Sequence, residues 1–454
     1  MGNEPDDQMS FVRLLTYSNE LNICGIAAVT STWLKNTTNA ATIRTIIEGY
    51  GKLTKNFNAN VPAGGKYPAS ESLLKKVTSG HPIYGLTALE QRLSEAASAL
   101  IRAIDESSTD DPLWVTIWGG ANVLAEALPA VTESRDMSAI AEFVSKLRIY
   151  AISDQDDAGL WIRNQFPKLF FIVSYHGFSS YQTATWVGIS GEHFYHFDNG
   201  GPDTSIVTND WHQKHIRVGE LGKHYPNFTA IMEGDTPSFL PLIQNGLGDP
   251  NHPEWGSWGG RYDLVDKDGN DLLYSDMADL ATGVNGELFV SKFASIWRWR
   301  KDYQFDFAAR MKWSQAGNKE TLNHHPVAVL NGTCGPTAWK VSLAIEDSVV
   351  LYASQSWDPD NDELEFDWSV YPEVTQDAFL IFPQLGSPVI FEALDTANSK
   401  VKASINPGMR MMFLPENNSN TDVHIILHIT DKRDMGLTSY RRIILQLIFE
   451  SVRD

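Results

Sequence analysis

Apolar runs and amphipathic stretches alternate along roughly the first half of the chain. Helical periodicity, with apolar residues on one face, covers 8–19, 36–54, 86–106, 121–128 and 157–165. Continuous apolar runs typical of buried strands cover 23–29, 113–118, 147–152 and 169–173. Strands and helices that alternate at this spacing favour a parallel sheet with helices on both faces. The sequence therefore predicts an α/β domain with a doubly wound, mostly parallel sheet.

The pattern changes after residue 310. Residues 312–323 are polar and lack apolar periodicity, which predicts a linker. Short strand patterns with turn signals follow at 326–330, 349–353, 364–368, 423–429 and 439–447. No convincing helical pattern separates them, which favours an antiparallel β-sandwich. We therefore expect two domains, at residues 1–310 and 325–454.

Charge narrows the range of partners. The chain has 36 Lys and Arg against 56 Asp and Glu, a formal net charge of -20. A surface this acidic repels phosphate backbones and anionic lipids, so nucleic acid and membrane partners are not expected. No run approaches the roughly 20 apolar residues that span a bilayer. Neutral sugars or cations are better suited as partners of this acidic surface. The sequence leaves open whether the chain forms a homodimer.

The chain start and the cysteines leave the localisation open. The first residues show neither a basic region nor an apolar stretch, so no signal peptide is visible. Two cysteines, Cys24 and Cys334, cannot make a disulfide framework, and Cys24 lies in an apolar run that predicts burial. Four glycosylation sequons permit secretion without showing it; they begin at Asn36, Asn227, Asn331 and Asn417.

Polar loops follow several of the predicted strands. Ligands of a doubly wound sheet gather beyond the carboxyl ends of its strands. The five loops are 2–7, 30–33, 118–122, 153–157 and 232–237. Three of them carry clustered carboxylates, which suit a hard cation or sugar hydroxyls. Acids at a helix start are also favoured by the helix dipole, which is the simpler explanation for any one of these loops.

These loops supply the candidate substrate contacts. The indole of Trp33 could stack on a sugar ring beside the hydroxyl of Thr32. Paired glycines before Asn122 let the backbone approach a ligand closely. The other candidates are acidic: Glu4, Asp154 and Asp156.

Several motifs resemble a known family. Residues 2–7, Gly-Asn-Glu-Pro-Asp-Asp, resemble the Asp-x-Asp-x-Gly-x-Asp-Asp start of calcium-dependent nucleoside hydrolases. Residues 115–122 resemble their Gly-Pro-Leu-Thr-Asn segment. Nearly the whole chain is similar to the cellulose-binding, nucleoside-hydrolase-like proteins, with further matches at 152–157, 233–239 and 256–262. The resemblance implies a nucleoside-hydrolase-like fold followed by an immunoglobulin-like C-terminal sandwich.

The resemblance also assigns roles to individual residues. It makes Asp7, the backbone carbonyl of Trp118, and Asp235 ligands of a calcium ion. Asp6 would hold sugar hydroxyls as a catalytic residue. Calcium takes oxygen ligands, orients two sugar hydroxyls and lowers the pKa of a bound water. That water would attack an oxocarbenium-like anomeric carbon.

Two departures from the family pattern affect these expectations. An early Asp that nucleoside hydrolases use as ligand and base would precede Met1, together with the strand that carries it. Gly234 stands where nucleoside hydrolases often have a His that protonates the leaving base, and Glu233 is the nearest acid that could replace it. We therefore expect calcium to bind weakly, with a dissociation constant above about 0.1 mM.

Two functions remain open at this point. The first is a calcium-dependent, glycosidase-like hydrolase of N- or O-glycosyl bonds in a carbohydrate or nucleoside-like substrate. The second is a non-catalytic polysaccharide-binding, for example cellulose-binding, protein with a degenerate hydrolase domain. A strand ending in Thr-Asp, encoded before Met1 in the natural gene, would favour the first function, whereas its absence from the gene would favour the second.

Some features of the C-terminal half are predicted to be structural. Residues 358–362, Asp-Pro-Asp-Asn-Asp, resemble the start of an EF-hand, but Glu363 and Ser369 replace its Gly and closing Glu, so a turn is expected. The aromatic residues Trp357 and Trp368 are predicted to be core. Two histidines, His424 and His428, flank an apolar strand and are expected at an edge or at the surface.

Overall fold

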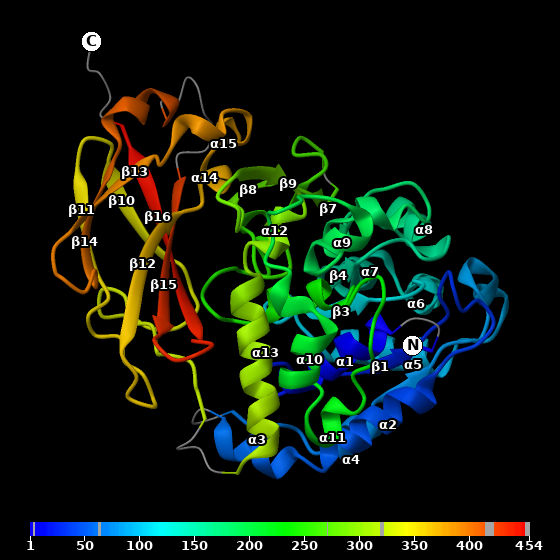
Figure 1. The fold of residues 1–454 in the computed structure, drawn as a ribbon. Helices are drawn as coiled ribbons and strands as arrows, with labels where there is room; N and C mark the ends of the chain where they lie inside the picture. Colours follow the sequence, from blue (N-terminus) through cyan, green and yellow to red (C-terminus); the bar gives the residue numbers. More distant parts are fainter. Residues whose placement is uncertain (3–4, 62–64, 270, 318–321, 414–421, 450–454) are drawn as a thin grey trace.

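The structure is a computed structural model of the chain. It describes residues 1–2, 5–61, 65–269, 271–317, 322–413 and 422–449. In Figure 1 a broad N-terminal part, coloured blue to green, lies beside a C-terminal part built mainly of yellow to red strands. No helix in the described ranges is long and apolar enough to cross a membrane.

A five-stranded sheet forms the centre of the N-terminal part, in the order β3-β4-β5-β7-β6. Its strands are β3 (Leu113–Ile117), β4 (Leu147–Ala151), β5 (Phe170–Val173), β7 (Leu273–Asp276) and β6 (Tyr262–Leu264). The first four are parallel, and β6 is antiparallel to β7. The predicted mostly parallel sheet is confirmed, because β3, β4 and β5 coincide with the apolar runs in the sequence.

Helices between these strands cover the sheet. They are α6 (Asn122–Ser134), α7 (Met137–Ser145) and α8 (Ala158–Gln165). Their apolar faces share one buried cluster with β3, β4 and β5, including the fully buried Leu128 and Ile162. Burial of these faces holds the carboxyl ends of the strands at one edge, which fixes the start of the loops that follow them.

The first hundred residues form a smaller layer beside this sheet. Strand β1 (Ile26–Ala28) pairs in parallel with β2 (Val77–Ser79), apart from the central sheet. The helices are α1 (Asp6–Thr16), α2 (Ala40–Gly51), α3 (Thr54–Asn60), α4 (Ser70–Leu74) and α5 (Glu95–Glu106), with a 3-10 turn η1 (Gly85–Glu90). The backbone N–H of Gly120 donates to the carbonyl of Thr30 at 2.8 Å. This bond brings the loop after β1 against the loop after β3.

Two predictions in this layer are wrong. The helix predicted from residue 86 begins only at Glu95, because the Ser94 hydroxyl caps it by accepting from the N–H of Ala97 at 3.1 Å. Cys24 is exposed, not buried. The apolar run around it forms only the short strand β1, which packs on one side and leaves much of the run accessible.

Short elements occupy the region between β5 and the long helix α13. They are η2 (Tyr181–Thr183), η3 (Thr185–Ile189), α9 (Glu192–Tyr195), η4 (Ser205–Val207), α10 (Asn209–His215), α11 (Gly219–Gly222), η5 (Thr236–Ser238), η6 (Leu240–Leu242), η7 (Pro253–Trp255), β8 (Asp279–Thr282), β9 (Leu288–Ser291) and α12 (Ala294–Trp297). Strands β8 and β9 pair as an antiparallel hairpin. The sequence predicted none of these elements as such.

Helix α13 (Arg300–Gln315) lies next to the C-terminal strands in Figure 1. It includes residues 312–315, which were predicted to be linker. The helix continues there because Trp313 is buried and its indole N–H donates to the carbonyl of Asn323 at 2.8 Å. The predicted domain limits at 310 and 325 stay predictions.

The C-terminal part contains two sheets, β10-β16-β15-β12 and β11-β14-β13. Their strands are β10 (Trp339–Ala344), β11 (Ser348–Tyr352), β12 (Leu364–Val370), β13 (Val389–Ala393), β14 (Lys400–Ile405), β15 (Asp422–Asp431) and β16 (Thr438–Ile448). Short helices connect them: α14 (Pro372–Thr375), α15 (Ala378–Ile381), η9 (Pro383–Leu385) and η10 (Pro407–Phe413). Apolar residues of both sheets enter one buried cluster, among them Leu351 and Ile425.

Several C-terminal predictions need correction. Residues 326–330 form only isolated bridges and no strand. His424 is buried on the inner strand β15, where its Nδ1 contacts Arg442 at 3.0 Å, and burial holds its pKa well below the usual range. His428 stacks on Trp299 of the N-terminal part. Trp357 is 54% exposed and therefore not core.

Buried polar contacts join the two parts. The Tyr371 hydroxyl donates to Asp279 at 2.5 Å, and Arg442 donates from Nε to the carbonyl of Leu247 at 2.6 Å. Tyr440 of β16 belongs to the main N-terminal core cluster. The C-terminal strands therefore pack directly on the part that carries the predicted site.

Candidate metal and sugar site

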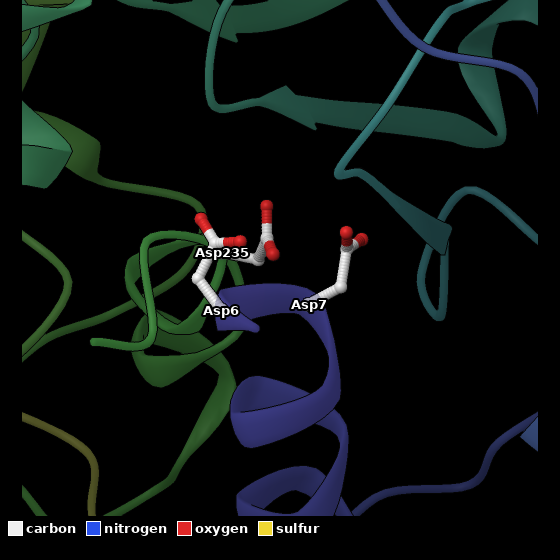
Figure 2. Close-up of side chains that lie close together, drawn as sticks. All are labelled: Asp6, Asp7 and Asp235. Carbon is white, nitrogen blue, oxygen red and sulfur yellow. The ribbon is translucent and has the colours of Figure 1, made fainter. Parts of the chain in front are cut away.

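Three carboxylates meet at the start of α1. Asp6 and Asp7 occupy its first turn, and Asp235 is the N-cap residue of η5. One oxygen from each lies within 4.8 Å of the others. Figure 2 shows the three side chains gathered above the first turn of α1. The expected meeting of Asp7 and Asp235 is thus present, within the distance that one shared ion requires.

These carboxylates line an open, polar pocket at the surface. Apart from Met1, its other lining residues follow strand ends of the small sheet and the central sheet, as expected for ligand loops. The lining consists of Met1, Asp6, Asp7, Ser31, Trp33, Leu34, Trp118, Gln155 and Asp235. Trp33 is 51% exposed, so its indole is accessible at the pocket.

Trp118 lines this pocket, and its backbone carbonyl is a predicted calcium ligand. This carbonyl accepts a hydrogen bond from Nε2 of Gln155 at 2.7 Å. A carbonyl oxygen has two lone pairs, so this bond leaves one for a further partner. The Trp118 indole donates to Ser238 at 2.8 Å, which ties the loop after β3 to the segment that carries Asp235.

Gln155 is a lining residue that the sequence reasoning did not single out. Its backbone carbonyl accepts from the hydroxyl of Thr32 at 2.5 Å, and Thr32 also accepts from Tyr181 at 3.2 Å. Gln155 therefore links the loops after β1, β3 and β4. Its position between Asp154 and Asp156, in a loop that follows a strand end, is the sequence feature that could have predicted its place at the pocket.

The amino group of Met1 lies among the carboxylates. It is 3.0 Å from Oδ2 of Asp7. Burial alone would lower the pKa of this amino group, but Asp7, and then Asp235 and Asp6, raise it above its ordinary value. The cluster thus already attracts a positive charge, and any metal cation bound to Asp7 would compete with this ammonium.

Glu233 lies behind the pocket in a buried ion pair. Its side chain is fully buried, and Oε2 is 2.5 Å from Nε of Arg13. Tyr225 donates to Oε1 at 2.6 Å, and Thr236 donates to Oε2 at 3.0 Å. These contacts engage both carboxylate oxygens away from the pocket, so they give no support to its predicted role as an acid.

Gly234 has no room for a side chain. A Cβ built there would lie 2.7 Å from the ring of Trp186 and 2.9 Å from Oδ2 of Asp6. Trp186 is buried and its indole donates to Ser153 at 2.9 Å, so the ring is held in place. The buried ring of Trp186 therefore leaves no space for a larger side chain at position 234.

We expect Gly234→Ala to destabilise the protein by about 1–3 kcal/mol through overpacking, and to displace Asp6. Urea unfolding measures the first effect, and calcium titration measures the second. Gly25→Ala is a matched control, because its Cβ meets nothing within 4 Å. Equal stability of both variants would show that Trp186 can move aside.

The remaining predicted contacts do not line the pocket. Glu4 lies outside the described residues. Asp154 is ion-paired with Arg163 at 2.6 Å. The Asn122 side chain is buried and donates to the carbonyl of Ile83 at 3.0 Å. Thr32 supports Gln155, as described above, so these side chains shape the loops around the pocket.

Asp156 is buried close behind the loop after β3. It is 2% exposed, and a Cβ at Gly120 would lie 2.3 Å from its Oδ2, so only glycine fits there. Burial raises the pKa of Asp156 to about 6, although N–H groups of Ala121 and Ala158 oppose the shift. The structure therefore gives Asp156 a packing role beside the pocket.

This raised pKa predicts a pH effect on stability. Because the folded state favours the protonated acid, stability should fall as pH rises from about 4, the unfolded pKa, to about 6. Asp156→Asn should remove that loss and stabilise the protein at about pH 7 by roughly 1–3 kcal/mol. Urea unfolding of both proteins at about pH 4 and pH 7 tests this. Parallel pH profiles would refute it.

Comparisons with known proteins identify the family. Residues 1–262 match the family model described as the cellulose-binding Sde182, nucleoside hydrolase-like domain, and residues 348–447 match the Sde0182 C-terminal domain. The chain belongs to this cellulose-binding, nucleoside-hydrolase-like family. The resemblance seen in the sequence motifs is therefore confirmed.

A solved structure supports the same assignment over the full length. It is a nucleoside hydrolase-related hypothetical protein from Saccharophagus degradans, described as associated with carbohydrate metabolism. The two chains are 29% identical with a TM-score of 0.76, covering 99% of this chain and 98% of the other. The comparison with curated proteins gives no match. The nucleoside-hydrolase-like fold of this family member is thus established.

Proposed function

We propose that this chain is a calcium-dependent hydrolase of glycosyl bonds in a carbohydrate or nucleoside-like substrate. The observation that carries the proposal is the meeting of Asp6, Asp7 and Asp235 within 4.8 Å in an open pocket. Oxygens that bind one calcium at about 2.3–2.6 Å lie within about 5 Å of one another. The donor set, all oxygen and mostly anionic, therefore fits a calcium ion.

Asp7, Asp235 and the Trp118 carbonyl are the ligands that we assign to the ion. Calcium at such a site orients two sugar hydroxyls and lowers the pKa of a bound water. Asp6 lies beside these ligands and can accept a hydrogen bond from a sugar hydroxyl. Trp33 offers an exposed apolar face to the sugar ring.

The surroundings of the pocket restrict the leaving group. Among the lining residues the acids are Asp6, Asp7 and Asp235, all in the cluster. Glu233 is held by Arg13, and among the described residues no other acid lines the pocket to protonate a departing group. This supports a substrate whose leaving group departs as a stable anion, such as an aryl glycoside.

The same restriction favours a second candidate function. A site that orients sugar hydroxyls without a general acid can bind a polysaccharide and leave it intact. The family is described as cellulose-binding, which is consistent with such a role. In this alternative the carboxylate cluster and Trp33 form a binding site alone.

We also propose that the C-terminal sheets form an immunoglobulin-like sandwich that stabilises the hydrolase-like part or binds carbohydrate. Support comes from the single buried cluster to which both sheets contribute. The exposed indole of Trp357 offers a surface that a sugar chain could contact.

A substrate screen separates the two functions. The full chain is stripped with a chelator and assayed on nucleosides and aryl glycosides, with and without added calcium. We expect calcium-dependent release from an aryl glycoside that is lost in Asp7→Asn. Calcium-independent retention on cellulose without turnover of any substrate would favour the binding protein and refute the hydrolase.

A further inference from the structure

A second group of three carboxylates lies in the C-terminal part, far in sequence from the pocket. Asp358, Asp360 and Asp362 each place one oxygen within 4.8 Å of the others. They occupy the turn before β12. Oδ1 of Asp358 accepts from the N–H groups of Asp360 at 2.7 Å and Asp362 at 3.1 Å. The predicted turn is therefore present, but the turn alone does not use all of these oxygens.

The second oxygen of Asp358 is buried and is not used by the turn. Asp358 is only 6% exposed, and its Oδ2 has no hydrogen-bond partner among the described residues. A buried, unsatisfied carboxylate oxygen costs free energy unless a cation or a donor compensates it. Because Oδ1 already accepts two bonds, Oδ2 is the oxygen of Asp358 that remains available to an ion.

Neighbouring groups compensate the cluster only in part. Asp362 is ion-paired with Arg433 of the loop after β15. Asp360 accepts from the backbone N–H of His324 at 2.8 Å and contacts its Nδ1 at 3.0 Å. One guanidinium therefore faces three carboxylates, together with one imidazole. The site retains negative charge and joins three separate chain segments.

We propose that Asp358, Asp360 and Asp362 form a second calcium site, distinct from the pocket at Asp6, Asp7 and Asp235. Three carboxylate oxygens at this spacing can reach one ion with ligand distances of about 2.3–2.6 Å. The ion satisfies Oδ2 of Asp358 and fixes the turn against His324 and Arg433. Because Arg433 competes for Asp362, the expected dissociation constant is about 10⁻⁴–10⁻³ M.

Calcium titration of the full-length chain tests the second site. In an Asp7→Asn background, which removes a ligand of the first site, one calcium should still bind per chain. Adding Asp358→Asn should abolish that binding. The turn should be kept, because the amide Oδ1 of the asparagine can still accept the two backbone hydrogen bonds. Glu365→Gln is the matched control, because it removes one exposed negative charge from β12 and no cluster ligand.

Thermal unfolding gives a second readout. Saturating calcium should raise the midpoint of Asp7→Asn and of Asp7→Asn/Glu365→Gln, but not that of Asp7→Asn/Asp358→Asn. The inference is overturned if Asp7→Asn binds no calcium, or if adding Asp358→Asn leaves binding unchanged. The single variant Asp358→Asn tests the first site by itself, because it removes only the second. If Asp358→Asn binds no calcium while Asp7→Asn does, the proposed function fails and the second site stands.

Discussion

Replacing Asp7 by asparagine is expected to weaken calcium binding at the pocket more than about 100-fold, because the site loses one of three charged ligands. Asp235→Asn should have an effect of similar size, since its oxygen lies within the same 4.8 Å cluster. Calorimetric titration of the chelator-treated chain measures both, in an Asp358→Asn background so that calcium at the second proposed site does not contribute. Turnover of any calcium-dependent substrate should fall in parallel, because the same ion orients the sugar.

A matched variant separates this effect from a general loss of negative charge. Asp110 is exposed and precedes the amino end of β3, at the opposite edge of the sheet from the pocket. Asp110→Asn should therefore bind calcium as the unmodified chain does. Unchanged affinity in both Asp7→Asn and Asp235→Asn would place the ion elsewhere and end the proposal.

Stability without calcium provides a check that these variants are folded. Three carboxylates within 4.8 Å repel one another, and the Met1 ammonium offsets only part of this. Asp235→Asn should therefore leave the unfolding midpoint of the calcium-free protein unchanged or raise it.

The central sheet could be predicted from the sequence because its strands are unbroken apolar runs. Phe170–Val173, for example, is buried along its whole length. Such a strand appears in the sequence as a continuous apolar run and needs no alternation of apolar and polar residues to be recognised. The region from Tyr181 to Trp297 could not be predicted, since its 3-10 turns and four-residue helices are too short to show a period. Strand β13 was missed because it mixes exposed and buried positions without a clean pattern. Strand β14, in contrast, alternates outward and buried positions along Lys400–Ile405, so its sequence does carry the strand signal.

The candidate site was predictable only in part. Acidic loops at strand ends indicated a site at one edge of the sheet, and the resemblance to nucleoside hydrolases indicated that Asp7 and Asp235 would meet there. Nothing local shows that Glu233 turns away from that edge. Its partner Arg13 lies 220 residues earlier in the chain, so only the folded structure pairs them. The same limit applies to Asp358, whose unsatisfied oxygen depends on how the turn packs.

Glu233→Gln is expected to destabilise the protein by about 3–5 kcal/mol, because it leaves the Arg13 guanidinium buried without its counter-charge. The two side chains are fully buried and 2.5 Å apart. Burial alone would lower the pKa of Arg13, but Glu233 raises it above its usual range, so the guanidinium stays charged. Urea unfolding of both proteins measures the loss of stability.

A double-mutant cycle distinguishes this structural role from catalysis. Arg13→Met removes the buried charge, so Arg13→Met/Glu233→Gln should lose several kcal/mol less than the sum of the single variants. If Glu233 instead acts as an acid at the pocket, Glu233→Gln will keep its stability and lose turnover in the folded protein. The present contacts predict the opposite, because Arg13, Tyr225 and Thr236 already engage both carboxylate oxygens. Loss of stability in Glu233→Gln thus assigns Glu233 to the buried ion pair, whereas loss of turnover without loss of stability assigns it to the reaction.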